Sequence, residues 1–121
     1  MSASIQTVFK FPPFDAGRYE GCEFLMSLGD ALLTVIVEDL PAIEIVFQRV
    51  RWHEFTAVYN CSAEQMEGAH FAVAEVLCSQ SLAKYVANDK APIKAYSELH
   101  HYRIFLDETG CHEVYAQSCS F

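Results

Sequence analysis

The stretch Glu98–Ser118, with the sequence ELHHYRIFLDETGCHEVYAQS, decides the fold class predicted for this chain. Two runs of alternating side chains flank a turn-forming Asp-Glu-Thr-Gly sequence, which is typical of a β-hairpin. Successive side chains of a strand point to opposite faces of a sheet. The stretch therefore predicts two antiparallel strands, and the side chains that share a face can be used to determine their register.

The apolar residues of the two strands limit that register. Tyr102, Ile104 and Leu106 share one face of the first strand. Val114 and Ala116 provide the apolar face of the second strand, and the two faces coincide only if the loop has an odd length.

We expect a loop of three residues, 108–110, with Asp107 opposite Cys111. A type I turn followed by a residue in the left-handed conformation favours glycine in the last loop position. Gly110 occupies that position. Turn chemistry and the apolar pattern therefore indicate the same register.

The other face of the hairpin carries mixed aromatic and charged side chains, and we expect it to be exposed to solvent. Its residues are His101, Arg103, Phe105, Glu113, Tyr115 and Gln117. Arg103 and Glu113 are expected to be diagonal neighbours there, forming an ion pair of little energetic value.

Three of the five histidines lie in this hairpin, which raises the question of a metal site. His100 and His101 are neighbours on a strand, so they point to opposite faces and cannot readily bind one ion together. His112 lies far from His100 along the hairpin. No pair has the spacing that metal sites commonly use. We predict no metal and no cofactor here, with His101 solvated and His100 and His112 at the rim of the buried face, unless residues elsewhere complete a site.

Composition limits the class of protein. A chain of 121 residues can form one domain with a buried core, so we take residues 1–121 as a single domain. Its net charge is −8, from sixteen acidic and eight basic residues. Nucleic acids and anionic membranes are not expected partners, because binding phosphates requires clustered Lys and Arg. Another protein with a basic surface is the partner class that this charge favours.

The five cysteines are widely spaced, odd in number and without a C-x-x-C motif; they are Cys22, Cys61, Cys78, Cys111 and Cys119. The sequence opens without a recognisable secretory signal. We therefore predict free thiols and a cytoplasmic location. The longest aliphatic run, residues 32–37, is too short to span a bilayer.

Residues 1–20 are expected to form an extended arm on the core. Its prolines at 12 and 13 disfavour ladder hydrogen bonds, and Phe9, Phe11 and Phe14 could anchor it. The alternative is that this proline-containing segment is a ligand for a proline-recognition groove.

Two more β-rich regions follow. Residues 22–27 and 31–37 predict a hairpin that turns at Gly29. The segment 42–58 is too long for one ordinary strand, so we expect two strands, or one strand that changes sheets, with a bend near Arg49.

Ser62 and Gln65 form a capping box that begins a helix. Alanine-rich composition favours one long helix from this point. The polar sequence after residue 77, which has the character of a new N-cap, favours a split: a short helix ending at Gly68, a strand over 70–77 and a second helix over 79–87. We favour the split form.

Together these patterns predict an α+β domain: a mostly antiparallel sheet of about six or seven short strands, one or two helices and the C-terminal hairpin. Residues 88–95 are expected to be a turn-rich connector into that hairpin.

Catalytic motifs are absent from the sequence, which has no glycine-rich phosphate loop, G-x-S-x-G or H-E-x-x-H. Cys61 precedes a helix whose amides could lower its thiol pKa, with His53 as a base, but nothing in the sequence brings the two together. Trp52 could line a ligand pocket with His53 and Glu54, although a lone tryptophan in a β-rich run usually packs structurally. We favour a protein that is not an enzyme.

The order of these features resembles that of small, mostly uncharacterised bacterial proteins, some of which are grouped with the immunity proteins of polymorphic toxin systems. The residues that carry the resemblance are IEIVF at 43–47, VRW at 50–52, AEVLCSQSL at 74–82 and HYRIFLDETGCHEVYA at 101–116. The resemblance spans roughly residues 30–117 and rests on turns and alternation. It implies an acidic inhibitor or binding protein with no catalytic residues to transfer.

We therefore expect a non-enzymatic protein-binding module, of the immunity type if the resemblance extends to function. Candidate contact residues, chosen because Tyr, Trp and Arg dominate interface energetics, are Trp52, Tyr59, His101, Arg103, Phe105, Glu113 and Tyr115. Two alternatives remain open. One is a small-molecule-binding or enzymatic domain with a pocket between sheet and helix; the other is a structural domain that forms a homodimer through a sheet edge.

Overall fold

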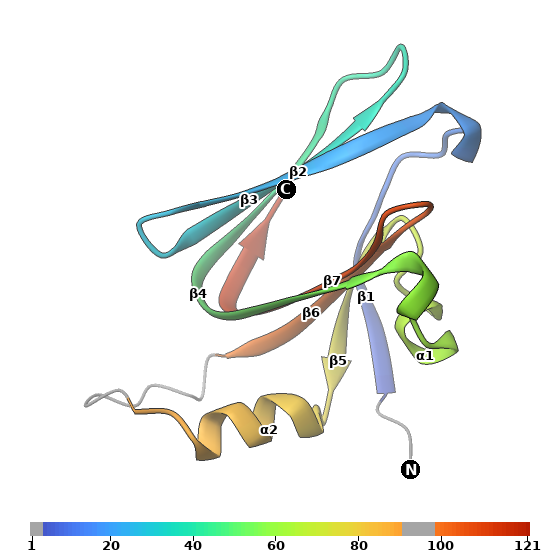
Figure 1. Cartoon of the computed structure of the whole chain (residues 1–121). Coiled ribbons are helices and arrows are strands. Elements are labelled where there is room, and N and C mark those ends of the chain that lie inside the picture. Colours follow the sequence, from blue (N-terminus) through green and yellow to red (C-terminus); the bar gives the residue numbers. More distant parts are fainter. Residues whose placement is uncertain (1–3, 91–98) are drawn as a thin grey trace.

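One antiparallel sheet forms the framework of the computed structural model, which describes residues 4–90 and 99–121 (Figure 1). Within these ranges its seven strands are β1 (Ser4–Lys10), β2 (Tyr19–Ser27), β3 (Asp30–Val37), β4 (Ile43–Ala57), β5 (Ala72–Leu77), β6 (His100–Leu106) and β7 (Gly110–Ser120). They lie in the order β1-β5-β6-β7-β4-β3-β2. The predicted α+β class, with its mostly antiparallel sheet, is confirmed.

Short helical elements join the strands: the 3-10 turns η1 (Ala16–Arg18) and η2 (Val58–Asn60), and the helices α1 (Ala63–Met66) and α2 (Gln80–Ala87). No helix in the part of the chain that the structure describes is long and apolar enough to span a membrane. Residues 91–95 of the predicted connector lie outside the described residues.

The split interpretation of the helical region is confirmed, because β5 separates α1 from α2. Ser62 and Gln65 form the predicted capping box of α1. Ser79 caps α2, where its Oγ accepts a hydrogen bond from the backbone N–H of Leu82 at 3.1 Å. Each capping hydroxyl satisfies an amide that has no partner inside its helix.

The predicted hairpin that turns at Gly29 is confirmed as β2 and β3, with Ser27 opposite Asp30. The segment predicted as two strands, or as one strand changing sheets, is instead the continuous strand β4 within one sheet. Its first part pairs with β3 and its longer second part with β7. The expected bend is present: Arg49 has a φ of 53°, and the register with β7 shifts between Val50 and Trp52.

The bend in β4 lets the sheet curve, so that β2 and β3 face β5, β6 and β7 (Figure 1). The main apolar core fills the concave side between these two halves. Its buried residues include Leu33, Val35, Ile45, Phe47, Val73, Tyr102, Ile104, Leu106, Val114 and Ala116. The apolar face assigned to the C-terminal hairpin from its sequence is therefore a core face.

The N-terminal segment contributes to the same core. Phe11 is buried there, and Phe9 and Phe14 pack against it. Within the predicted arm, residues 4–10 form the edge strand β1, which pairs antiparallel with β5. A bulge at Val8 interrupts that pairing.

In the C-terminal hairpin, β6 and β7, the same side chains share a face as predicted, and the loop has the predicted three residues. The predicted residue pairs are wrong. Cys111 lies opposite Phe105 rather than Asp107, and Leu106 lies opposite Gly110. The three-residue loop is therefore 107–109, one residue earlier than expected. Gly110 belongs to β7 because it pairs with Ala57 of β4, a long-range contact that overrides the local turn preference.

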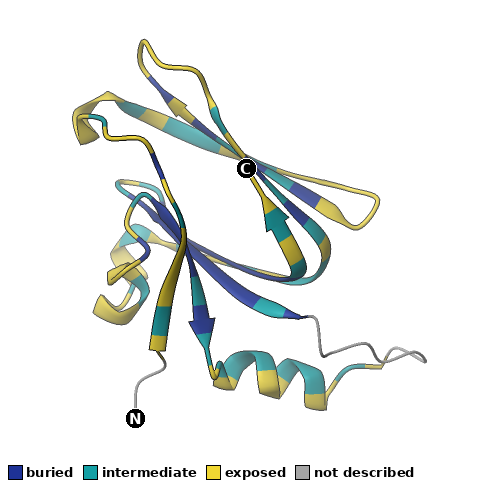
Figure 2. Cartoon of the chain, turned by 180° about the vertical axis from the view of Figure 1, so that it is seen from behind, coloured by how far each residue is buried: buried dark blue, intermediate teal, exposed yellow. Residues whose placement is uncertain are grey.

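The face of this hairpin that was expected to be exposed is buried, with Gln117 only partly exposed (Figure 2). His101, Arg103, Phe105, Glu113 and Tyr115 are all less than 9% exposed. The residues that cover this convex face come from α1, α2 and the segment 67–71. Strand alternation correctly separated the two faces, but both faces are covered.

Candidate functional site

A buried polar network occupies the convex face of β6 and β7. The Glu113 carboxylate accepts hydrogen bonds from Arg103 Nε at 2.9 Å and lies 2.8 Å from His101 Nε2. Arg103 and Glu113 are directly opposite each other, not diagonal as predicted. The network reaches α1 through Gln65 Nε2, which donates to Glu113 at 3.3 Å.

The electrostatics of the network keep Glu113 ionised. Burial alone would raise the pKa of its carboxyl group, but the hydrogen bond from His101 and the charge of Arg103 outweigh burial and lower the pKa to about 2. A buried charge of this kind is stable only while its partners remain in place. The network therefore fixes α1 against the sheet.

Ser79, His101 and Glu113 form a hydroxyl–imidazole–carboxylate series that has the composition of a catalytic triad. Ser79 Oγ lies 2.7 Å from His101 Nδ1. The same Oγ accepts the capping hydrogen bond from Leu82, and the imidazole is only 2% exposed. Because the ring is buried and the hydroxyl is bound to the amide of its own helix, we interpret the series as the attachment of α2 to β6 and β7.

The hypothesis of an activated Cys61 is not supported by its surroundings. Its Sγ donates hydrogen bonds to the backbone oxygens of Thr56 at 3.4 Å and Ala57 at 3.5 Å. Burial raises the thiol pKa, which is the opposite of activation. His53, its predicted base, is instead hydrogen bonded to His112.

A cluster missed in the sequence lies on the concave face, where β2 packs over β4 and β7. His53 Nε2 lies 3.1 Å from His112 Nδ1, and Cys22 Sγ lies 3.8 Å from His112 Nε2. The ring of Phe24 stacks on His53 with centroids 3.9 Å apart. Burial, and secondarily the charge of His53, lowers the pKa of His112 to about 4, so we expect both rings to be neutral near pH 7.

The cluster does not form a chelating site. Cys22 and His53 contact different ring nitrogens of His112, which places them on opposite sides of the imidazole. In the described ranges, no group of three or more His, Cys, Asp or Glu side chains is arranged to hold a metal ion.

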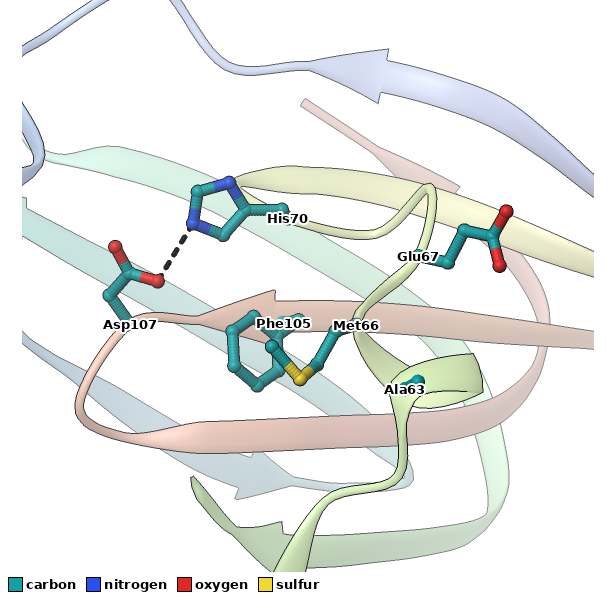
Figure 3. Close-up of a pocket in the computed structure, with 6 residues that line it drawn as sticks. All are labelled: Ala63, Met66, Glu67, His70, Phe105 and Asp107. Carbon is teal, nitrogen blue, oxygen red and sulfur yellow. Dashed lines mark hydrogen bonds and ion pairs between the residues drawn. The ribbon is translucent and has the colours of Figure 1, made fainter. Parts of the chain in front are cut away.

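A pocket of about 470 Å³ opens between α1, the segment after it and the turn between β6 and β7 (Figure 3). Phe105, Met66 and Ala63 form its apolar wall. On one side His70 and Asp107 face each other, with His70 Nε2 2.7 Å from Asp107 Oδ1. The pocket also borders on Glu67, whose side chain lies on the side away from this pair (Figure 3).

The segments that form the pocket are acidic. Residues 52–83 contain no Lys or Arg, and neither do residues 104–121. The two pocket-forming segments, 63–70 and 105–109, contribute Glu64, Glu67, Asp107 and Glu108. The pocket thus combines an apolar wall with an acidic surrounding, which suits an aliphatic or aromatic group that carries a positive charge.

The predicted contact residues do not form this site. Tyr59 is 97% exposed in η2, whereas Trp52 is only partly exposed and stacks on Tyr85 of α2 with centroids 4.9 Å apart. Of the five predicted hairpin residues, only Phe105 reaches the pocket, as part of its wall. No sequence pattern indicated that His70 and Asp107 would meet, because 36 residues separate them in the sequence.

Comparison of this chain with protein-family models, curated proteins and solved structures found no match.

Proposed function

We propose that this protein is a non-enzymatic protein-binding module, and that the pocket beside α1 receives a lysine or arginine side chain of a basic partner. The observation that carries the proposal is the pairing of an apolar wall, Phe105 and Met66, with a surrounding of carboxylates. A long basic side chain can pack its aliphatic stem on such a wall while its charged group meets Asp107 or Glu67.

The charge of the whole chain supports the same class of partner. A net charge of −8 attracts a basic protein at long range and repels acidic ones. The resemblance to immunity proteins extends the proposal to an inhibitor that binds a basic toxin in the cytoplasm. The free thiols of all five cysteines are compatible with that reducing compartment.

NMR titration of the whole ¹⁵N-labelled chain tests the pocket. The probes are capped arginine and capped citrulline, which have similar shape but differ in charge. We expect arginine to shift the amides of Ala63, Met66, His70 and Asp107, with weaker binding at high salt because exposed charges are screened. Citrulline should bind less tightly.

Variants then test the acidic surrounding. Asp107→Asn and Glu67→Gln should each weaken arginine binding about two- to fivefold, the effect of losing one exposed charge pair. Glu44→Gln, an exposed carboxylate near the start of β4 that does not line the pocket, is the matched control and should bind like the wild type. Equal binding of arginine and citrulline, or shifts confined to another surface, would contradict the proposal.

The same titration distinguishes the second candidate function, a small-molecule-binding domain. The pocket between α1 and the sheet is the observation in its favour. A neutral aromatic probe such as indole should bind weakly if a basic side chain is the natural occupant. If indole binds more tightly than capped arginine at every salt concentration, the small-molecule function replaces the protein-binding one.

A further inference from the structure

The outer edge of β2 is the feature from which a further inference can be drawn. β2 is the last strand in the sheet order, and among the described residues it pairs only with β3 (Figure 1). Its other side therefore presents backbone N–H and C=O groups that another strand can pair with.

The two edges of the sheet differ in how they are protected. The edge strand β1 has a bulge at Val8 in the middle of its length, and a bulge disturbs a regular edge. In β2 the irregularity lies at the start, between Tyr19 and Gly21. From Gly21 to Ser27 the register with β3 is continuous, and this stretch contains neither proline nor lysine. It is thus a regular edge whose one protective feature is the charged side chain of Glu23.

Exposed apolar side chains gather at the same end of β2. Leu25 is 64% exposed, Met26 is 49% exposed, and Leu28 at the turn is 103% exposed. Leu28 also has a φ of 52°, a conformation that is costly for a leucine. Leu25 and Met26 point to opposite faces of the sheet, so an exposed apolar side chain flanks the strand edge on each face, as is typical of an edge that associates.

Charge indicates which partner fits. Residues 22–29 contain one charged side chain, Glu23, although the chain as a whole carries −8. A basic partner would find little to bind there. A second copy of the same chain, which is repelled elsewhere on the surface, can approach most closely at this weakly charged edge.

A two-fold axis perpendicular to the sheet restricts how two copies of β2 can pair, because each residue must lie opposite one of the same parity. Centring the axis on Glu23 would place like charges opposite each other. Centring it on Leu25 places Leu25 opposite its equivalent, Phe24 opposite Met26 and Glu23 opposite Ser27. This register joins apolar with apolar residues and a carboxylate with a hydroxyl.

We infer that the protein forms a symmetric homodimer in which the β2 edges of two copies pair antiparallel about Leu25, producing one continuous sheet. The inference goes beyond the proposed function and does not depend on it, since the pocket contains no residue of β2. A single strand edge buries a small area, so we expect a reversible dimer that forms at micromolar or higher concentration.

Sedimentation equilibrium of the full chain at low and high salt tests the dimer. We expect the dimer fraction to increase with salt, because salt screens the repulsion between two copies of charge −8. Leu25→Lys should reduce association at least tenfold, because it places two like charges at the axis. Leu40→Lys, at a site 43% exposed outside β2, is the matched control. Circular dichroism and thermal unfolding establish that both variants are folded.

Cysteine cross-linking tests the register, in a background where the exposed Cys78 is replaced by serine. Leu25→Cys should form a disulfide with itself across the axis. A mixture of Glu23→Cys and Ser27→Cys should cross-link, whereas Glu23→Cys alone should not. A chain that stays monomeric at millimolar concentration in high salt would overturn the inference, as would a dimer unaffected by Leu25→Lys. Efficient cross-linking of Glu23→Cys with itself would overturn the register. Asp107→Asn should leave the dimer unchanged, which separates this result from the pocket proposal.

Discussion

At the scale of single residues, Gly110 lies where β7 approaches β4 too closely for a side chain. An ideal Cβ at this position would be 2.1 Å from the backbone oxygen of Thr56. Its φ of 137° is also unfavourable for residues with a Cβ. The sequence identified this glycine as important but assigned it to the turn, whereas the structure assigns it to the contact between two strands.

Gly21 provides a matched control for that interpretation, since its φ is 135° and a Cβ there would meet nothing within 4 Å. Gly21→Ala should lower the free energy of unfolding by roughly 1–3 kcal/mol, the cost of backbone strain alone. Gly110→Ala should cost at least about 2 kcal/mol more or prevent folding, because β4 must move. Urea unfolding of both variants measures the difference. Equal losses would show that the conformation of Gly110, not its contact with Thr56, is what matters.

The buried imidazole of His112 makes stability depend on pH. Its pKa is lowered to about 4 in the folded state from 6.5, so the unfolded chain binds the proton more readily between those values. Above pH 6.5 this group therefore does not reduce the free energy of unfolding, and the free energy of unfolding decreases as the pH falls from 6.5 toward 4. The loss from this group is on the order of 3 kcal/mol.

His112→Gln should reduce this pH dependence, because glutamine can still donate a hydrogen bond but does not titrate. Chemical unfolding at several pH values between 5.5 and 7 measures the slope, in a range where Glu113 is almost fully ionised in both states. Ser118→Ala, on the same strand, is the control and should keep the wild-type slope. An unchanged slope in His112→Gln would assign the acid sensitivity to other groups.

At the scale of elements, α2 has only eight residues and none of them is buried. Helices of this length are marginal in isolation, so tertiary contacts must hold it. Those contacts include the capping Ser79 bonded to His101, the hydrogen bond from Tyr115 Oη to Ser81 at 3.0 Å, and Tyr85, which stacks on Trp52 and donates a hydrogen bond to Glu54. The attachment of α2 therefore depends on a few specific side chains.

Tyr85→Ala should loosen α2 and expose Trp52 to water. We expect the fluorescence of Trp52, the single tryptophan, to shift to longer wavelength, with a fall in the free energy of unfolding of about 1–3 kcal/mol. Lys84→Ala, on the exposed side of α2, should leave the emission unchanged. An unaltered spectrum in Tyr85→Ala would mean that the other contacts suffice to hold the helix.

At the scale of the whole molecule, the curved sheet decides which groups meet. The absence of Lys and Arg from residues 52–83 and 104–121 can be read from the sequence. Only the packing of α1 beside the β6–β7 turn turns these two stretches into one acidic surrounding of an apolar pocket. The pairing of β4 with β7 makes His53 and His112 diagonal neighbours, and the same curvature brings Cys22 and Phe24 of β2 onto this pair.

Features that depend on neighbours in the sequence were predictable. The capping box of Ser62 and Gln65, the cap at Ser79 and the turn at Gly29 rest on local hydrogen bonds or local backbone conformation. Which side chains of the C-terminal hairpin share a face was predictable for a similar reason, because successive side chains of a strand point to opposite faces. Its pairing was predicted incorrectly because β4, more than fifty residues away from Gly110, determines it.

The sequence by itself thus determined the α+β class, the hairpin at Gly29, the two capped helices with a strand between them, which side chains of the final hairpin share a face, and the acidic character of the chain. The tertiary structure alone decided that both faces of that hairpin are covered, that His101 and Glu113 are buried together, and that His70 meets Asp107. The physical reason is the separation along the sequence of the groups that interact. Caps, turns and alternation arise within a few residues, whereas burial and side-chain pairing depend on segments that only the folded sheet brings together.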